Sequence, residues 1–503
     1  MQALFNAAVE SASLSKLSKV LPLLRANSVF VCLLAAGGLL RLLVWWAYQP
    51  AILVLADSYY YLRAATVGTG LGADRPFLYS LGFIKPLLAL SSLSLVTAVQ
   101  HLLSLATAAL IYALLRRLDV PRILAAAGAA LLLVDGYQLN IEQHILAETL
   151  FESLSVSGLA AIVWFRKGPV AIYLLGGVLL SLSSITRFVG LALLPLAITY
   201  LAVIRAGWIR LCALIVGISI PLVVYPALLD NGGDNSSLKY RVGLRLYGKV
   251  ASFADCSQVK VPRDERQLCI DKKPSQRRHY YSPWSHSTPT RRMNLPPEKR
   301  EAVVTSFTMR FLRAQPQGFA RVVSRDFLRF FSWTSTNQLA QPPIKRWEFF
   351  ASKREFYSQA GTAWTFGKFR QTQGAPPPEL GLNEHLSLNR EISKPLSSYQ
   401  SLFYARGPLL AFLVLLGVLG AIFGREPEGS QSSCRGACLL FTLSGVALYL
   451  FPATFATFHF RYVISALPML GPGGAMGAWL LLSRVSDLRA AKHRLRVSAR
   501  RSL

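Results

Sequence analysis

Long apolar runs, separated by short polar clusters, dominate the sequence. Read with a window of about 19 residues, the pattern predicts about ten membrane-spanning helices. We place them at residues 28–48, 95–115, 121–138, 147–165, 170–186, 188–205, 209–229, 404–424, 436–456 and 461–483. A helix of about 20 apolar residues is long enough to cross a bilayer core. The pattern therefore predicts an α-helical polytopic membrane protein.

The charge of the connecting segments predicts the orientation of these helices. Short clusters of Arg and Lys follow the second, fourth, sixth and eighth predicted spans, and the tail after Arg484 is basic throughout. Such clusters stay in the cytoplasm. Residues 1–27 and 484–503 are then cytoplasmic, while loops 49–94, 139–146 and 230–403 lie outside it. Arginine outnumbers lysine, which favours a bacterial plasma membrane over the alternative, the endoplasmic reticulum.

Residues 230–403 interrupt the apolar pattern between the seventh and eighth predicted spans. They separate a transmembrane module at 28–229 from C-terminal helices at 404–483, and they are numerous enough for a small domain. We expect a basic extracytoplasmic insert domain. Cys256 and Cys269 both fall in it, on the oxidising side, where a disulfide closing a loop of about 15 residues contributes on the order of 3 kcal/mol.

The composition of the chain argues against two functional classes, namely nucleic-acid-binding proteins and transporters built from two related halves. The chain is 52% hydrophobic and has a formal net charge of +29. No zinc-finger spacing, basic-zipper heptad or RNA-binding aromatic signature accompanies that charge, so nucleic acid is not an expected partner. The sequence has no internal repeat, which counts against transporters built from two related halves. The basic insert suits anionic surfaces such as phospholipid.

Asp57 follows the first apolar run and precedes three tyrosines, Tyr59, Tyr60 and Tyr61. An ionisable residue where a helix leaves the bilayer is costly and usually functional. We expect a general base, or a carboxylate that orients an acceptor, in an aromatic-walled cleft. In the alternative interpretation, Asp57 caps a helix that begins at Ser58 and the tyrosines anchor the membrane interface.

The second outer loop contains His144, Glu148 and Glu152 at i, i+4 and i+8. A helix would place all three on one face. That arrangement suits a divalent-metal site or an acidic cluster facing a sugar, although a solvated helix start explains it nearly as well. Glu148 is the strongest candidate because it lies directly before an apolar run.

Three cations lie at the predicted outer ends of spans: Lys85, Arg187 and Arg461. If they converge on one outer-leaflet cleft, they bind a lipid phosphate, where Arg supplies a bidentate grip that Lys does not. Arg41 and Arg63 are weaker candidates for the same cleft. The alternative is that each cation reaches separately toward lipid headgroups.

The order of these features resembles the membrane-embedded GT-C glycosyltransferases. The similarity is greatest to the family 39-like enzymes, which include protein O-mannosyltransferases and the lipid A aminoarabinose transferase. Most relatives carry a second acid where Ser58 follows Asp57, and a histidine in the motif that reads Arg75-Pro76 here. The corresponding stretches are 57–61, 75–82, 147–150, 186–190 and 460–462 with Pro468.

This resemblance implies transfer of a sugar from a polyprenyl-phosphate donor to an acceptor outside the cytoplasm, with membrane lipid as a further partner. It implies that Asp57 activates the acceptor hydroxyl and that Arg187, Arg461 and Lys85 hold the departing phosphate. Glu148 would contact the sugar or, with His144, a divalent metal, the one cofactor considered.

The alternatives are a flippase or transporter of lipid-linked intermediates and a non-catalytic scaffold. A transporter should place charges near the bilayer midplane, whereas these ionisable residues gather at the outer ends of spans.

Overall fold

The computed structural model describes most of the chain as helix. It describes residues 25–53, 55–67, 77–165, 168–229, 242–277, 288–333, 347–352, 384–426, 434–456 and 458–501, with Pro22, Tyr281 and Leu382. The helices of the bundle are α2 (Ser28–Ala47), α5 (Leu93–Arg117), α6 (Arg122–Val134), α8 (Glu148–Trp164), α9 (Val170–Ser184), α10 (Leu193–Val203), α11 (Trp208–Leu229), α18 (Gly407–Phe423), α19 (Cys434–Phe455) and α21 (Leu467–Arg501).

Four described helices are long and apolar enough to cross a membrane, namely Ser28–Ala47, Leu93–Arg117, Trp208–Tyr225 and Cys434–Phe455. The number rises to six if each of two sharply bent helix pairs counts as one span. These helices are consistent with a multi-pass membrane protein. The count of ten spans stays a prediction, because α8, with 17 residues, and α9, with 15, are shorter.

The predicted span at 121–138 is not one straight helix. It breaks at Asp135, where α6 meets α7 (Gly136–Glu142) at 52°. Asp135 is extended, and its carboxylate accepts hydrogen bonds from the backbone N–H groups of Tyr137 and Gln138, as an N-cap does. The predicted loop at 139–146 is consequently half helix and wholly buried. A hydropathy average over about 19 residues does not detect one acid that caps a new helix, so the break was not predicted.

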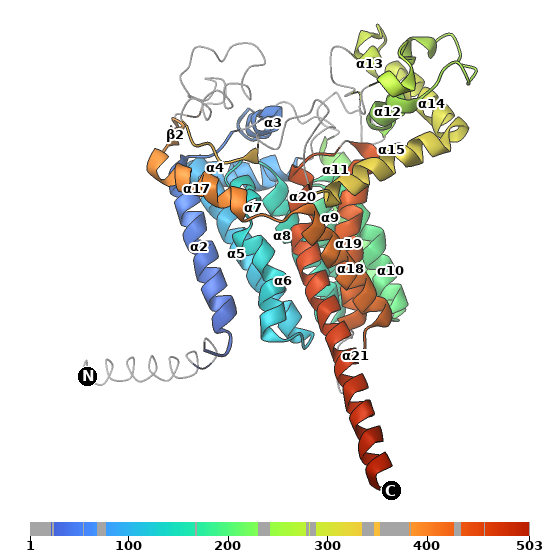
Figure 1. The fold of residues 1–503 in the computed structure, drawn as a ribbon. Coiled ribbons are helices and arrows are strands. Elements are labelled where there is room, and N and C mark those ends of the chain that lie inside the picture. The colour runs from blue at the N-terminus through green and yellow to red at the C-terminus, as the bar shows by residue number, and fades with distance from the viewer. Residues whose placement is uncertain are drawn as a thin grey trace.

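Short helices collect at the end of the bundle opposite the projecting α21 (Figure 1). They are α3 (Leu55–Thr66), the π-helix η1 (Leu78–Ile84) with α4 (Lys85–Leu90), α7, α17 (Arg390–Leu402) and α20 (Arg461–Ile464). Two-residue strands β1 (Tyr48–Gln49) and β2 (Ser387–Leu388) pair antiparallel there, with Tyr48 opposite Leu388. This end of the bundle carries most of the predicted site residues.

The residues of the predicted insert contribute to two separate cores. Helices α12 (Val242–Phe253) and α14 (Pro297–Ala314) form a small core of their own, beside a Cys256–Cys269 disulfide. Met293, which directly follows the short helix α13 (Pro289–Arg292), joins this core. A fully buried Lys249–Asp326 ion pair joins α12 to α15 (Pro316–Leu328), which contacts α19. Residues 347–350 and 386–396, by contrast, pack into the main core. The insert as one domain therefore stays a prediction.

Helices α9 and α11 touch backbone to backbone at two glycines. A Cβ atom on Gly217 would lie 2.2 Å from the carbonyl oxygen of Leu174, and one on Gly177 would lie 2.3 Å from that of Leu214. Both distances are well below van der Waals contact, and the obstructing atoms belong to the backbone. The two helices therefore have to separate before either position accepts a side chain.

We predict that Gly217→Ala destabilises the protein, because forced overpacking costs about 1–3 kcal/mol. The matched control is Gly38→Ala in α2, where a Cβ atom meets nothing within 4 Å. Alanine favours a helix over glycine by up to about 1 kcal/mol, so this control should be neutral or slightly stabilising. Thermal unfolding in detergent, followed by tryptophan fluorescence, measures both. Equal midpoints for the two variants would contradict the close contact.

Candidate functional site

Asp57 and Arg461 meet at the end of the bundle that carries the short helices, although 404 positions separate them in the sequence. Asp57 lies in the first turn of α3, and Arg461 is the first residue of α20. Nη1 of Arg461 donates a hydrogen bond to Oδ2 of Asp57 at 2.5 Å. The two side chains keep 17% and 18% of their surface exposed, so this ion pair remains accessible from outside the protein.

Glu148 lies between two arginines. It is the first residue of α8, where the helix dipole favours a carboxylate. Its Oε1 atom is 3.2 Å from Nη1 of Arg187 and 3.7 Å from Nε of Arg461. Arg187 stands directly before the 3₁₀ helix η2 (Phe188–Ala192), and its Nη1 also donates to Oγ of Ser465 at 2.7 Å. Two carboxylates and two guanidinium groups thus form one cluster, which we call the ion-pair cluster.

The ring of Tyr462 packs against both guanidinium groups of the ion-pair cluster. Its centroid is 5.6 Å from Cζ of Arg187 and 5.4 Å from Cζ of Arg461, and Phe151 lies 5.7 Å from Cζ of Arg187. Such cation–π contacts favour a fixed orientation of each guanidinium plane. Tyr462 belongs to the 460–462 stretch of the resemblance, but neither Tyr462 nor Ser465 was among the predicted site residues. Their spacing of one and four residues after Arg461 is the signal that could have identified them.

Other residues of the predicted site lie elsewhere. Tyr61 is buried in the core, edge-on to Tyr79 at 5.0 Å, while Tyr59 and Tyr60 are half-buried. Lys85 is exposed at the start of α4 and, within the described ranges, forms no ion pair with Asp57 or Glu148. The motif residues Arg75 and Pro76 lie outside the described residues. Arg41 is buried deeper in the bundle.

His144 does not share a helical face with Glu148 and Glu152, which corrects the prediction from spacing. It precedes α8 in a non-helical segment, where it forms a parallel bridge with Ile52. Hydrogen bonds from the N–H of Ile52 to the carbonyl of Gln143, and from the N–H of Ile145 to that of Ile52, hold this segment out of the helix. Pairing with a distant segment has overridden the local helical pattern.

The hydrogen bond made by His144 defines its tautomer. Its ring lies 2.8 Å through Nδ1 from the carbonyl oxygen of Asn140, which is an acceptor, so Nδ1 carries the proton. Burial lowers the pKa of His144 to about 4, so the ring is neutral at neutral pH and Nε2 keeps its lone pair. Among the described residues, no three His, Cys, Asp or Glu side chains lie together as a metal site requires. The donor set around His144 therefore does not fit a divalent metal.

Ser58 connects the helix of Asp57 to the segment before Glu148. It is buried, and its hydroxyl donates a hydrogen bond to the carbonyl oxygen of Ile145 at 3.1 Å. An ionised carboxylate at this position would present an acceptor to an acceptor. Ser58, which stands where the resembled family carries an acid, thus makes a hydrogen bond to Ile145 that an ionised acid could not make.

Several buried polar atoms of residues 140–152, and one of Trp347, have no hydrogen-bond partner among the described residues. They are Nδ2 and Oδ1 of Asn140, Nε2 of His144, Oγ1 of Thr149, Oε1 of Glu152 and Nε1 of Trp347. Leaving such a group unpaired costs about 1–3 kcal/mol, so ordered water or a bound ligand is needed to satisfy them.

A row of aromatic rings leads from these atoms to the ion-pair cluster. Ring centroids are 5.6 Å apart for His144 and Trp347, 5.2 Å for Trp347 and His459, and 5.8 Å for His459 and Tyr462. Trp347 comes from the predicted insert, and no local pattern in the sequence pointed to it.

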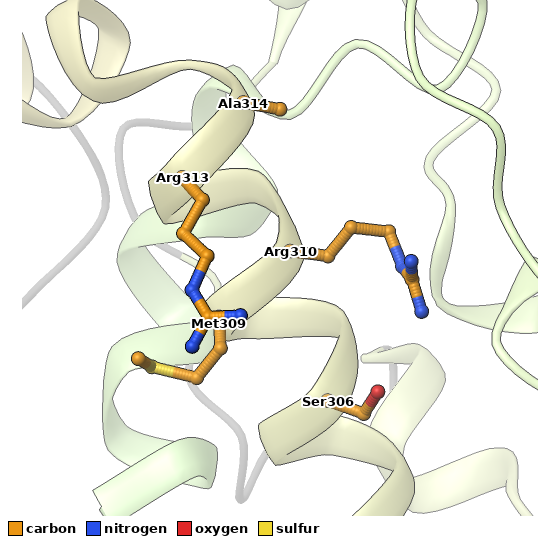
Figure 2. A pocket seen from close by; sticks show the side chains of 5 residues that line it. All are labelled: Ser306, Met309, Arg310, Arg313 and Ala314. Carbon is orange, nitrogen blue, oxygen red and sulfur yellow. The ribbon is translucent and has the colours of Figure 1, made fainter.

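A separate hollow of about 500 Å³ lies on α14 (Figure 2). Its lining residues are Ser306, Met309, Arg310, Arg313 and Ala314. Glu265 accepts hydrogen bonds from both Arg310 and Ser306, which compensates the charge of Arg310. These contacts belong to the small core of α12–α14, and the lining contains no residue of the ion-pair cluster.

Comparison with known proteins gives little beyond this geometry. No model of a protein family matches the chain, and no curated protein matches it. Among solved structures, the chain is similar to the oligosaccharyltransferase of Archaeoglobus fulgidus in its apo form, with 15% sequence identity and a TM-score of 0.38. The match covers 94% of this chain and 52% of that one, so the chain spans about half the length of that enzyme.

We predict that Ser58→Ala lowers stability by about 1 kcal/mol through the lost hydrogen bond. Ser58→Asp should lower it more, because a buried carboxylate would face the carbonyl of Ile145. Thermal unfolding of the purified variants measures both effects. If Ser58→Asp were as stable as the parent protein, the proposed donor role of Ser58 would be wrong.

Proposed function

We propose that this protein is an integral-membrane glycosyltransferase of the GT-C type. It transfers a sugar from a polyprenyl-phosphate donor to a hydroxyl acceptor outside the cytoplasm. One observation carries this proposal: Asp57, Glu148, Arg187 and Arg461 converge in a single cluster at one end of the apolar helices. Opposite charges at that depth provide both a phosphate grip and a carboxylate for the acceptor.

The transfer breaks the bond between the sugar's anomeric carbon and a phosphate oxygen. The acceptor hydroxyl oxygen forms the new bond to that carbon, and its proton moves to a carboxylate. The departing polyprenyl phosphate gains negative charge as the bond breaks. Preorganised guanidinium groups aimed at that charge stabilise the transition state. Arg187 and Arg461 are the residues that we assign to this role.

The exposure of the two carboxylates separates their roles. Asp57 keeps 17% of its side chain exposed, whereas Glu148 keeps 3%. An acceptor arriving from outside therefore reaches Asp57 first, which suits a general base. Glu148 contacts both arginines, so it is better placed to hold them apart and orient them toward the phosphate.

The ion-pair cluster is electrically balanced before any ligand binds. Each arginine has a carboxylate partner, which keeps partly buried cations tolerable in the absence of substrate. Arg187 contacts its partners in the ion-pair cluster through Nη1, and Arg461 does so through Nη1 and Nε. The Nη2 group of each guanidinium can therefore turn to a phosphate. A phosphate that engages Arg461 weakens its hold on Asp57 and frees that carboxylate for the acceptor proton.

The unpartnered polar atoms beside Glu148 support a sugar as the transferred group. Sugar hydroxyls need several donors and acceptors at once, set among apolar and aromatic walls. Asn140 offers both kinds of atom, Nε2 of His144 offers an acceptor and Trp347 offers a donor. We propose that these groups contact the sugar hydroxyls.

We predict that Asp57→Asn lowers sugar transfer by at least 10²-fold, the usual scale for loss of a general base. Arg461→Lys should lower transfer by about 10²-fold, because a point charge does not replace the fork of donors. The assay uses membranes containing each variant, supplied with radiolabelled polyprenyl-phosphate mannose, glucose or arabinose, and counts label in acceptor material.

The matched controls are Glu298→Gln and Arg321→Lys, which make the same chemical changes at exposed positions of α14 and α15. Both should transfer at the parent rate. Full activity of Asp57→Asn would remove Asp57 from catalysis. Movement of labelled donor across the membrane by the parent protein, without any transfer, would instead identify a flippase.

A further inference from the structure

The carboxylate of Glu142 is the centre of a fully buried polar network between α2, α5 and α7. Nε and Nη2 of Arg41 donate to its two oxygens, each at 2.8 Å. Nε2 of Gln138 donates to Oε1 at 3.0 Å, and Nδ1 of His101 lies 2.9 Å from Oε2. Glu142 has no exposed surface, and Arg41 has 2%. The carboxylate thus has four close nitrogen partners and no access to solvent.

The neighbours of His101 determine where its protons lie. Nε2 of the ring is 2.8 Å from Oε1 of Gln143. The amide of Gln143 is not free to rotate by half a turn, because its Nε2 donates to the carbonyl oxygen of Tyr48 at 2.6 Å. An amide nitrogen must face that carbonyl, so an amide oxygen must face His101. Nε2 of His101 therefore carries a proton.

The second ring nitrogen of His101 faces a carboxylate. One proton lies between Nδ1 of His101 and Oε2 of Glu142, and either atom could hold it. Arg41 decides between them, because its two parallel N–H donors match an ionised carboxylate. The proton is then on the ring, and both nitrogens of His101 are donors.

We propose that His101 is a buried imidazolium and that Arg41, Glu142 and His101 form a charged triad that positions the segment carrying Glu148. The triad holds two cations and one anion, with the cations on α2 and α5 and the anion at the end of α7. Gln138 joins Glu142 to a further titratable group, Glu152, because its Nε2 donates to both carboxylates. These residues act through their neighbours and are positioning residues.

Hydrogen bonds connect the triad to the residues that precede Glu148. Gln143, held by His101, accepts through its carbonyl oxygen from the N–H of Ile52. Gln100, one residue before His101, donates to the carbonyl oxygens of Glu142 and His144 at 2.7 and 2.9 Å. The triad and Gln100 thus hold residues 142–144, and Glu148 follows four residues later, at the start of α8. Loss of the His101 charge should loosen this segment first.

The protonation of His101 can be measured directly. The full-length protein, labelled with ¹⁵N-histidine and held in lipid nanodiscs, gives ring nitrogen resonances for its seven histidines. The His101→Gln variant assigns the signal, or, if that variant does not fold, replacement of the other six histidines one at a time does. We expect both nitrogens of His101 to be protonated at neutral pH. A ring with an unprotonated Nδ1 would overturn the proposal, because the proton would then reside on Glu142.

The positioning role has its own test by hydrogen exchange and mass spectrometry. His101→Gln should raise amide exchange in residues 143–148 at least tenfold, while α9 and α11 exchange as in the parent protein. The matched control is Thr107→Val on the same helix, whose hydroxyl bonds only within α5, to Leu103. Unchanged exchange at 143–148 in His101→Gln would overturn the positioning role. Neither measurement needs a substrate, so both outcomes are independent of the proposed transferase activity.

Discussion

The Arg41–Glu142 ion pair is the contact on which the end of the bundle with the ion-pair cluster depends. A charge in an apolar interior is tolerable only when a counter-charge and enough hydrogen bonds surround it. Glu142 meets that requirement with donors from α2, α5 and α7 at once. Because those donors come from separate helices, satisfying one carboxylate sets the relative height of all three. The cap at Asp135 and the bridge between His144 and Ile52 then define the two ends of the short helix that carries Glu142.

The ion-pair cluster meets the same requirement differently. Asp57, Glu148, Arg187 and Arg461 balance one another, but Asp57 and Arg461 stay partly exposed, and both arginines leave N–H groups uncommitted. A saturated network holds structure, whereas an unsaturated one can exchange a protein partner for a ligand. The two clusters therefore have different roles. The buried triad holds the backbone before Glu148, and the ion-pair cluster, which includes Glu148, is the one that can bind a ligand.

Four residues of the ion-pair cluster were predictable because each stands where an apolar run ends. Membrane burial leaves few reasons for Asp57, Glu148, Arg187 or Arg461 to be there, so position alone carried the signal. The same reasoning was wrong for the helical alignment of His144. The spacing of His144, Glu148 and Glu152 fits a helix, but pairing with Ile52 keeps His144 out of it. Ile52 lies about 90 residues away, and local spacing does not encode such a distant contact.

The sequence by itself determined the helical character of the chain, the residues at which the apolar runs end and the candidate charges at those ends. These are local properties, because hydrophobic periodicity and helix caps act over a few residues. Only the tertiary structure decided which charges pair, that Trp347 joins the aromatic row and that Arg41 belongs with Glu142 rather than with Arg461. Pairing depends on side-chain geometry between segments up to 404 positions apart, and that geometry exists only once the helices have packed.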